Sequence, residues 1–147
     1  MFVIVGQDDV PLYEACLNTK KYLFLLIQEK QEAQSLVITQ YFSIHSSLDV
    51  IDEKLQITNQ KELDMFFKKI DRCYDQDIYA FVTATNIKLL LLISEKTKEE
   101  NVNNFFLEAY ENLNKSLMNP LYTLNTQITS QRFDEAIKLA AKKHLNL

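Results

Sequence analysis

The first hydrophobic positions along the chain form two short runs separated by a polar segment. Residues 2–5 (FVIV) are β-branched or aromatic and predict a strand, and residues 12–17 (LYEACL) predict a strand that returns beside it. Gly6 opens the segment between them, where it can take a positive φ, and Asp8 or Asp9 can cap the turn with its carboxylate. The chain therefore predicts an N-terminal hairpin.

The next clear periodicity is helical and covers residues 35–55. Apolar residues recur there at steps of three or four positions, which places them on one side of a helix. This predicted core stripe consists of Tyr41, Ile44, Leu48, Ile51 and Leu55. Residues 18–34 fit either a continuation of the preceding strand or a helix, and the pattern does not choose between them.

Three further strands are predicted in the middle of the chain. A weak one covers residues 64–71, and two strong ones cover residues 77–84 and 87–93, with Thr85-Asn86 as a tight turn between the strong pair. The last strand is apolar at consecutive positions, so both of its faces must be buried. We therefore expect helices on both sides of the sheet.

Two helices complete the predicted chain. One runs over about 98–118, with Thr97 and Glu100 as a capping box, and ends before Asn119-Pro120 because proline disfavours helical geometry in the preceding residue. The other begins near Ser130. The predicted order is β-β-α-β-β-β-α-α, an antiparallel α+β arrangement. Because no low-complexity linker or repeat interrupts residues 1–147, we expect one domain.

The stretch MNPLY at residues 118–122 allows two interpretations. As a helix stop, it is followed by an apolar anchor, Leu121 or Tyr122, that packs the chain back onto the domain. As a docking peptide, it would present the same apolar residues to a partner. We favour the helix stop, since it follows directly from proline geometry.

Composition narrows the class of protein. The 147 residues are 47% hydrophobic and 24% charged, with a net charge of −4 and no concentrated basic surface, which disfavours nucleic-acid binding. The apolar runs are far shorter than the roughly 20 residues that cross a bilayer. Cys16 and Cys73 have no CxxC spacing, so we expect reduced core or strand residues. A cytoplasmic protein without direct membrane insertion is expected.

Candidate chemistry is concentrated in HSSLDVIDEK, residues 45–54. His45, Asp49 and Asp52 lie at i, i+4 and i+7 of the predicted helix and form a polar stripe, which could supply metal ligands or a general base oriented by a carboxylate. An ordinary helix side-chain pair explains the spacing better, because a metal site needs further ligands and the only other histidine, His144, lies near the end of the sequence. We expect Asp52 at the buried edge, and Val50 about opposite the core stripe as an exposed apolar residue of a protein interface.

Other functional motifs are missing from the sequence. There is no GxGxxG, no GxxxxGK[ST] and no GxSxG, so the corresponding phosphate cradles and the nucleophile elbow are absent. The sequence predicts no catalytic residue, no metal and no cofactor. It favours a structural or partner-facing role for the strip at residues 45–54.

Four segments, in order, resemble the sedlin family. They are FVIVG…D…PLYE, HSSLDVIDEK, YAFVTATNIKLLLL and NNFFLEAYENLNKSLMNPLY…SQRFDEAIKLAAKKHL. HSSLDVIDEK resembles the sedlin-like paralogue more, whereas the start and the longer C-terminal block resemble sedlin itself. The resemblance implies a longin-like (profilin-like) fold, with a five-stranded antiparallel sheet, one helix on one face and two on the other.

The resemblance also implies a function. Members of this family are adaptor or scaffold subunits, without enzymatic activity, of the transport protein particle (TRAPP) complex. That complex tethers vesicles and promotes exchange on Rab-type GTPases in endoplasmic reticulum-to-Golgi transport. The implied partners are other TRAPP subunits, with an indirect link to a Rab-type GTPase and a peripheral location at endoplasmic reticulum and Golgi membranes.

The family also suggests where partners bind. Its LDxxDE motif matches Leu48, Asp49, Asp52 and Glu53, and the first acid is implicated in contacts to partner subunits, a role that passes to Asp49. Val50 joins Asp49 on the geometric argument above. Two alternatives stay open: a stand-alone profilin-like module that binds a ligand or lipid in an apolar pocket, and a small metal-dependent enzyme that uses His45, Asp49 and Asp52.

Overall fold

The computed structural model describes residues 1–17, 30–57, 65–73, 76–93 and 97–147. The described elements follow the predicted order, with one additional 3-10 turn. They are β1 (Phe2–Val5), η1 (Gln7–Asp9), β2 (Pro11–Ala15), α2 (Lys30–Ile57), β3 (Phe66–Cys73), β4 (Gln76–Val82), β5 (Lys88–Ile93), α3 (Glu99–Leu117) and α4 (Gln131–Leu145). Of the ambiguous segment 18–34, the last five residues begin α2, and residues 18–29 lie outside the described part of the chain.

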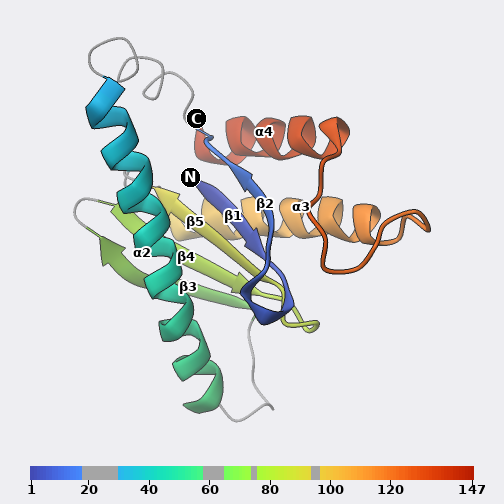
Figure 1. Cartoon of the computed structure of the whole chain (residues 1–147), viewed down its shortest axis with the longest axis horizontal. Helices are drawn as coiled ribbons and strands as arrows, with labels where there is room; N and C mark the ends of the chain where they lie inside the picture. The colour runs from blue at the N-terminus through green and yellow to red at the C-terminus, as the bar shows by residue number, and fades with distance from the viewer. Residues whose placement is uncertain (18–29, 58–64, 74–75, 94–96) are drawn as a thin grey trace.

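The five strands form one antiparallel sheet in the order β2-β1-β5-β4-β3. The first strand of the chain therefore lies between the hairpin partner β2 and the central strand β5, as Figure 1 shows. A turn joins β4 and β5 as predicted, but the connection covers residues 83–87 and is longer than the two-residue turn expected at Thr85-Asn86. The Asn86 backbone N–H donates to the Thr83 carbonyl oxygen at 2.9 Å, and Asn86 has a φ of 60°. The α+β arrangement and the antiparallel sheet are confirmed.

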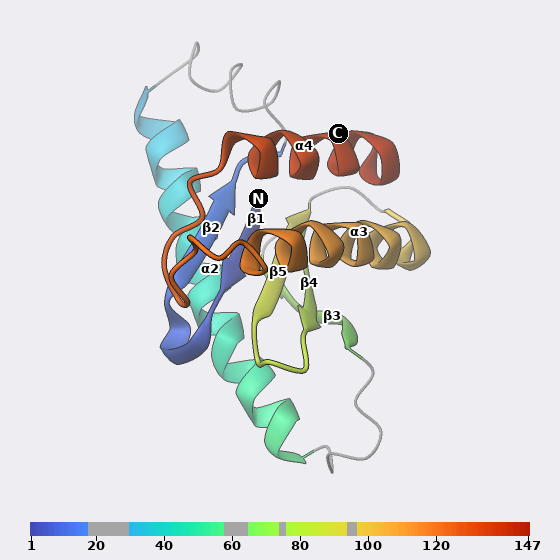
Figure 2. The ribbon, with the colours of Figure 1, turned by 90° about the vertical axis from the view of Figure 1, so that its right-hand side faces the viewer.

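Alternate residues of each central strand enter two different hydrophobic cores. Phe2, Leu89 and Leu91 pack with buried residues of α3 and α4, whereas Val3 and Leu90 pack with α2. This is the consequence of the two-residue period of a strand, which points successive side chains to opposite faces. The prediction that β5 is buried on both faces is confirmed, with α2 behind the sheet and α3 and α4 in front of it in Figure 2.

The helix stripes occupy the positions that their spacing predicts, but one cap differs. Ile44, Leu48 and Ile51 of α2 are buried, and Leu55 is partly buried against them. The N-cap of α3 is Lys98, which makes no side-chain capping hydrogen bond, so the predicted capping box of Thr97 and Glu100 is wrong. The helix simply begins one residue later, with Glu99 and Glu100 placed favourably in its first turn.

The cap of α4 follows the sequence more closely. Ser130 is its N-cap, and its hydroxyl accepts a hydrogen bond from the backbone N–H of Phe133 at 3.4 Å. Before it, α3 ends at Leu117, just ahead of the proline, as expected. Of the two proposed anchors, Tyr122 packs against the core, while Leu121 is exposed.

The turn after β1 uses Gly6 in a different way from the prediction. Its φ is −84°, and the positive φ values belong to Asp8 and Asp9. A Cβ at Gly6 would lie 2.3 Å from the Asn125 side-chain oxygen and 3.0 Å from Leu12. Glycine therefore leaves room for the Asn125 side chain of the loop before α4, which a larger residue at this position would have to displace.

Candidate protein-binding site

The packing of α2 on the sheet gives the residues of the polar stripe in HSSLDVIDEK different surroundings. Asp52 lies at the buried edge of the helix, as predicted, and its Oδ1 is 2.7 Å from the Lys88 ammonium nitrogen. Lys88 begins β5 and is buried, and it also contacts Asp9 of the N-terminal turn at 3.1 Å. Asp52 therefore forms part of a structural ion-pair cluster that joins α2, β5 and η1.

The charge of Lys88 is maintained by these two carboxylates. Burial alone would lower the pKa of its ammonium, because removal from water disfavours the charged form. Hydrogen bonds from Lys88 to Asp52 and Asp9 act in the opposite direction, and the pKa of Lys88 is raised above its usual value. The positive charge stays in place at neutral pH, and the two acids are oriented by it.

Asp49 and His45 lie away from the buried edge of α2. Both side chains are exposed on the outer surface of α2. Among the interactions of the described residues, none engages the Asp49 carboxylate, in contrast to that of Asp52. The three residues that share a stripe in the sequence therefore have different surroundings, and only Asp49 and His45 are open to a partner.

This division also bears on the metal-site hypothesis. No group of three or more His, Cys, Asp or Glu side chains that could hold a metal ion occurs within residues 1–17, 30–57, 65–73, 76–93 and 97–147. A site built from His45, Asp49 and Asp52 would need the carboxylate that Lys88 already contacts. The geometry therefore favours the structural interpretation of Asp52.

The outer surface of α2 contains two apolar residues that the sequence analysis missed. Ile38 and Phe42 are 68% and 77% exposed. Ile38, Phe42, His45 and Asp49 follow each other at steps of four, three and four, so they form one continuous outer stripe. The same helical spacing that identified the core stripe would have found this second stripe, which lies on a different side of the helix.

Val50 differs from its prediction. It is half-buried, so it is not the fully exposed apolar residue expected opposite the core stripe. Val50 therefore lies beside the outer stripe but does not belong to it.

The two cysteines lie at different kinds of position in the fold. Cys16 follows β2 and is exposed, so the prediction of a core or strand residue is wrong for it. Cys73 is the last residue of β3, as a strand position was expected, and its side chain lies outside the described part of the structure.

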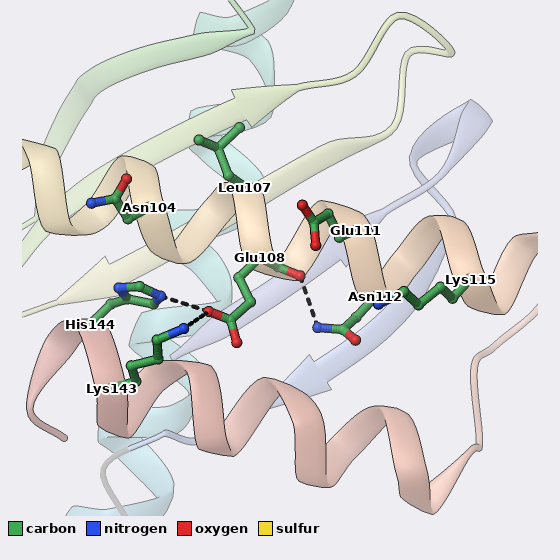
Figure 3. Close-up of a pocket in the computed structure, with 8 residues that line it drawn as sticks. All are labelled: Asn104, Leu107, Glu108, Glu111, Asn112, Lys115, Lys143 and His144. Atoms are coloured by element: carbon green, nitrogen blue, oxygen red, sulfur yellow. Dashed lines mark hydrogen bonds and ion pairs between the residues drawn. The ribbon is translucent and has the colours of Figure 1, made fainter.

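An open groove between α3 and α4 lies on the opposite face of the sheet (Figure 3). Glu108 accepts hydrogen bonds there from Lys143 at 2.9 Å and from the His144 ring at 2.7 Å. These contacts, Lys143 first, hold the pKa of Glu108 below its usual value against the effect of burial. All but one of the lining residues are polar: Asn104, Leu107, Glu108, Glu111, Asn112, Lys115, Lys143 and His144. The groove therefore lacks the apolar lining that a lipid-binding module needs.

No helix within the described residues is both long and apolar enough to span a membrane. The family model of Sedlin matches residues 4–143. A Drosophila melanogaster protein named probable trafficking protein particle complex subunit 2 is 33% identical over 144 residues, covering 98% of this chain and 95% of the relative.

Two further relatives support the same assignment. The Schizosaccharomyces pombe transport protein particle 20 kDa subunit is 33% identical over 142 residues, covering 97% of this chain and 96% of the relative. The Xenopus tropicalis trafficking protein particle complex subunit 2-like protein is 22% identical over 140 residues, covering 91% and 90%. The chain is thus more similar to these two subunits than to this paralogue-type protein. It belongs to the Sedlin family.

Proposed function

We propose that this chain is a non-enzymatic adaptor subunit of a TRAPP-type tethering complex. The support comes from its family and from relatives over nearly their whole length that are named as subunits of the trafficking protein particle. The finer role is endoplasmic reticulum-to-Golgi transport, in a complex that acts as an exchange factor for a Rab-type GTPase. The chain is cytoplasmic and reaches endoplasmic reticulum and Golgi membranes through the complex.

The observation that carries this proposal is the outer stripe of α2, which consists of Ile38, Phe42, His45 and Asp49. It combines two exposed apolar side chains with a carboxylate that has no partner among the described residues. Apolar side chains that anchor a partner, next to a charge that makes binding specific for one partner, are typical of a protein interface. We propose that Asp49, with Val50 at its flank, contacts another TRAPP subunit.

Strand β3, at one edge of the sheet, offers a less suitable surface for a partner. Edge strand β3 pairs with β4 through two register shifts, one between Phe66 and Lys69 and one between Lys69 and Asp71, and Lys68 has a positive φ of 55°. Bulges and lysines on an edge strand hinder the addition of another strand. This irregularity supports α2, rather than β3, as the surface for a partner.

The experiment is a binding series with the recombinant TRAPP subunits of the same organism. Asp49→Ala should leave the fold intact, with a change in the free energy of unfolding below about 0.5 kcal/mol, because the side chain is exposed. It should weaken the binding of one subunit. Glu111→Ala is the matched control, since it removes the same charge from an exposed position on α3, on the other face of the sheet from α2.

Two outcomes would contradict the assignment of Asp49 to the interface. Equal loss of binding in the two variants would show a general charge effect and not a contact of Asp49. A loss of several kcal/mol of stability in Asp49→Ala would make Asp49 a structural acid like Asp52, and the interface assignment would be wrong.

The non-enzymatic part of the proposal has its own test. Asp52 is engaged by Lys88, so His45 and Asp49 lack the third ligand that their stripe would need. We expect elemental analysis of the purified protein to show no stoichiometric zinc or manganese. Bound metal that disappears in a His45→Ala variant would support the metal-dependent enzyme instead.

A further inference from the structure

The connection between α3 and α4 carries an unusual surface. Within it, Met118, Leu121 and Leu124 are 80%, 90% and 77% exposed. We call these three residues the apolar tip. They lie within the seven consecutive positions 118–124, so all three belong to the same short connection.

The segment around the apolar tip is held firmly in its conformation. Tyr122 packs against the core, and its hydroxyl donates to the Thr126 carbonyl oxygen at 2.6 Å. The Asn125 amide donates to the Gln7 carbonyl oxygen at 3.2 Å, and the Ile128 backbone N–H donates to the Leu12 carbonyl oxygen at 2.7 Å. The side chains that close the loop therefore point inward and leave those of the apolar tip directed to solvent.

Closure of the loop does not require the three exposed side chains to be apolar. The inward-facing residues Tyr122 and Ile128 already provide its hydrophobic contacts. Exposed apolar side chains beyond those that function requires lower the solubility of an isolated chain. The residue types at 118, 121 and 124 are thus explained by a surface that is covered in an assembly.

The charges of the segment indicate what covers it. No acidic, basic or histidine residue occurs from Ser116 to Gln131, although 24% of the whole chain is charged. An apolar centre surrounded by uncharged polar residues, here asparagine, threonine and glutamine, is the composition of the core of a protein interface, where charged residues are depleted. A phospholipid surface is a poorer match, because peripheral binding through a few aliphatic side chains usually has the support of basic residues.

The position of the loop separates it from the outer stripe of α2. In Figure 1 the connection between α3 and α4 lies on the right, while α2 lies on the left. In Figure 2 the same connection is in front of the sheet and α2 is behind it. A partner at the apolar tip would leave the outer stripe accessible.

From these observations, and resting on the proposed function, we infer that the apolar tip inserts into an apolar pocket of a second TRAPP subunit. This subunit differs from the one that contacts Asp49. The chain then bridges two proteins through opposite faces of its sheet.

The test uses the full chain and each recombinant TRAPP subunit of the same organism in pairwise titrations. The variant carries Met118→Gln, Leu121→Gln and Leu124→Gln, which retain side-chain size and remove the apolar surface. The control carries Leu107→Gln and Leu139→Gln, two exposed apolar positions on α3 and α4 outside the loop. Thermal unfolding of both variants verifies that they fold.

We expect the apolar-tip variant to unfold like the wild type and to bind one subunit at least tenfold more weakly. It should keep the binding of the Asp49-dependent subunit, and the control should keep both. Unchanged affinity of the apolar-tip variant for every subunit would overturn this inference while the proposed function stands. A wild-type chain that binds no subunit would overturn the proposed function and the protein occupant together.

Two further arms examine other occupants. In the first, the chain is sedimented with phosphatidylcholine vesicles or with mixed phosphatidylcholine–phosphatidylserine vesicles. If the wild type co-sediments and the apolar-tip variant does not, the tip binds a lipid surface and the inference is overturned. Self-association in analytical ultracentrifugation that the same variant abolishes would assign it to a second copy of the chain, with the same consequence.

Discussion

Single residues in this chain show that the reason for a residue type can differ from the one that its sequence suggests. Gly6 is the only glycine, and a turn after a strand usually places glycine at a positive φ. Here the two aspartates after it take the left-handed conformation, which aspartate tolerates, and the glycine makes room for Asn125. The partner of Gly6 comes from a distant part of the chain and is invisible to local pattern analysis.

A first prediction tests this steric role. Gly6→Ala should lower the free energy of unfolding by about 1–3 kcal/mol, the usual cost of overpacking, because Cβ displaces the Asn125 side chain and tightens the contact with Leu12. Asn125→Gly removes the main obstacle and suits the φ of 59° at that position. Urea unfolding of the double-mutant cycle should show a smaller cost of Gly6→Ala in the Asn125→Gly background. Equal costs in both backgrounds would refute the steric explanation.

A second prediction concerns Glu108, whose carboxylate joins α3 to α4 through Lys143 and His144. Its pKa is lower in the folded chain than the usual value of 4.5, so its contribution to stability is present above about pH 4.5. That contribution is lost as the pH falls through the folded pKa. In Glu108→Gln the urea midpoint should therefore change less between pH 7 and pH 3.5 than in the wild type. An equal change of the urea midpoint in both proteins would show that Glu108 does not contribute to the loss of stability in acid.

At the scale of elements, the Lys88 cluster fixes the position of α2 on the sheet. Lys88 is the first residue of β5, and its ammonium reaches Asp52 of α2 and Asp9 of η1. The Tyr41 hydroxyl adds a hydrogen bond from α2 to the Glu14 carboxylate of β2. These contacts turn Asp52 inward and thereby leave Asp49 on the outer side of the helix.

A third prediction separates the two sides of this cluster. In Lys88→Met the half-exposed acids can hydrate, and the methionine keeps the apolar stem, so the loss in stability should be under about 1 kcal/mol. In Asp9→Asn with Asp52→Asn the buried ammonium loses both anions, and the loss should be about 3 kcal/mol. Urea unfolding at pH 7 provides both values. A larger loss for Lys88→Met would contradict the cluster geometry.

Element types and order were predictable because they follow from local periodicity. The strand pattern of β5 and the apolar stripes of α2, α3 and α4 each depend on residues a few positions apart. The features that the sequence pattern did not predict depend on packing between distant segments. The half-burial of Val50 and the exposure of Leu121 belong to this group, because neither can be read from spacing within one element. At the candidate site, helical geometry placed Asp52 at the buried edge, but its partner Lys88 required the sheet.

At the scale of the whole molecule, the two faces of the sheet have separate roles in this account. One face is covered by α2, whose outer stripe presents Asp49, and the other by α3 and α4, whose connection presents the apolar tip. Both surfaces lie outside the hydrophobic cores, so substitutions there should alter assembly and leave folding intact. An adaptor needs this separation, because two partners can then bind without competing for the same surface.

Affinity purification of the chain from its source organism, followed by mass spectrometry of the proteins that remain bound, tests the central claim most directly. We predict that other TRAPP subunits co-purify in near-stoichiometric amounts, and that Asp49→Ala loses part of this set while Glu111→Ala retains all of it. A chain that purifies alone, or with proteins other than TRAPP subunits, would contradict the assignment as an adaptor of such a complex.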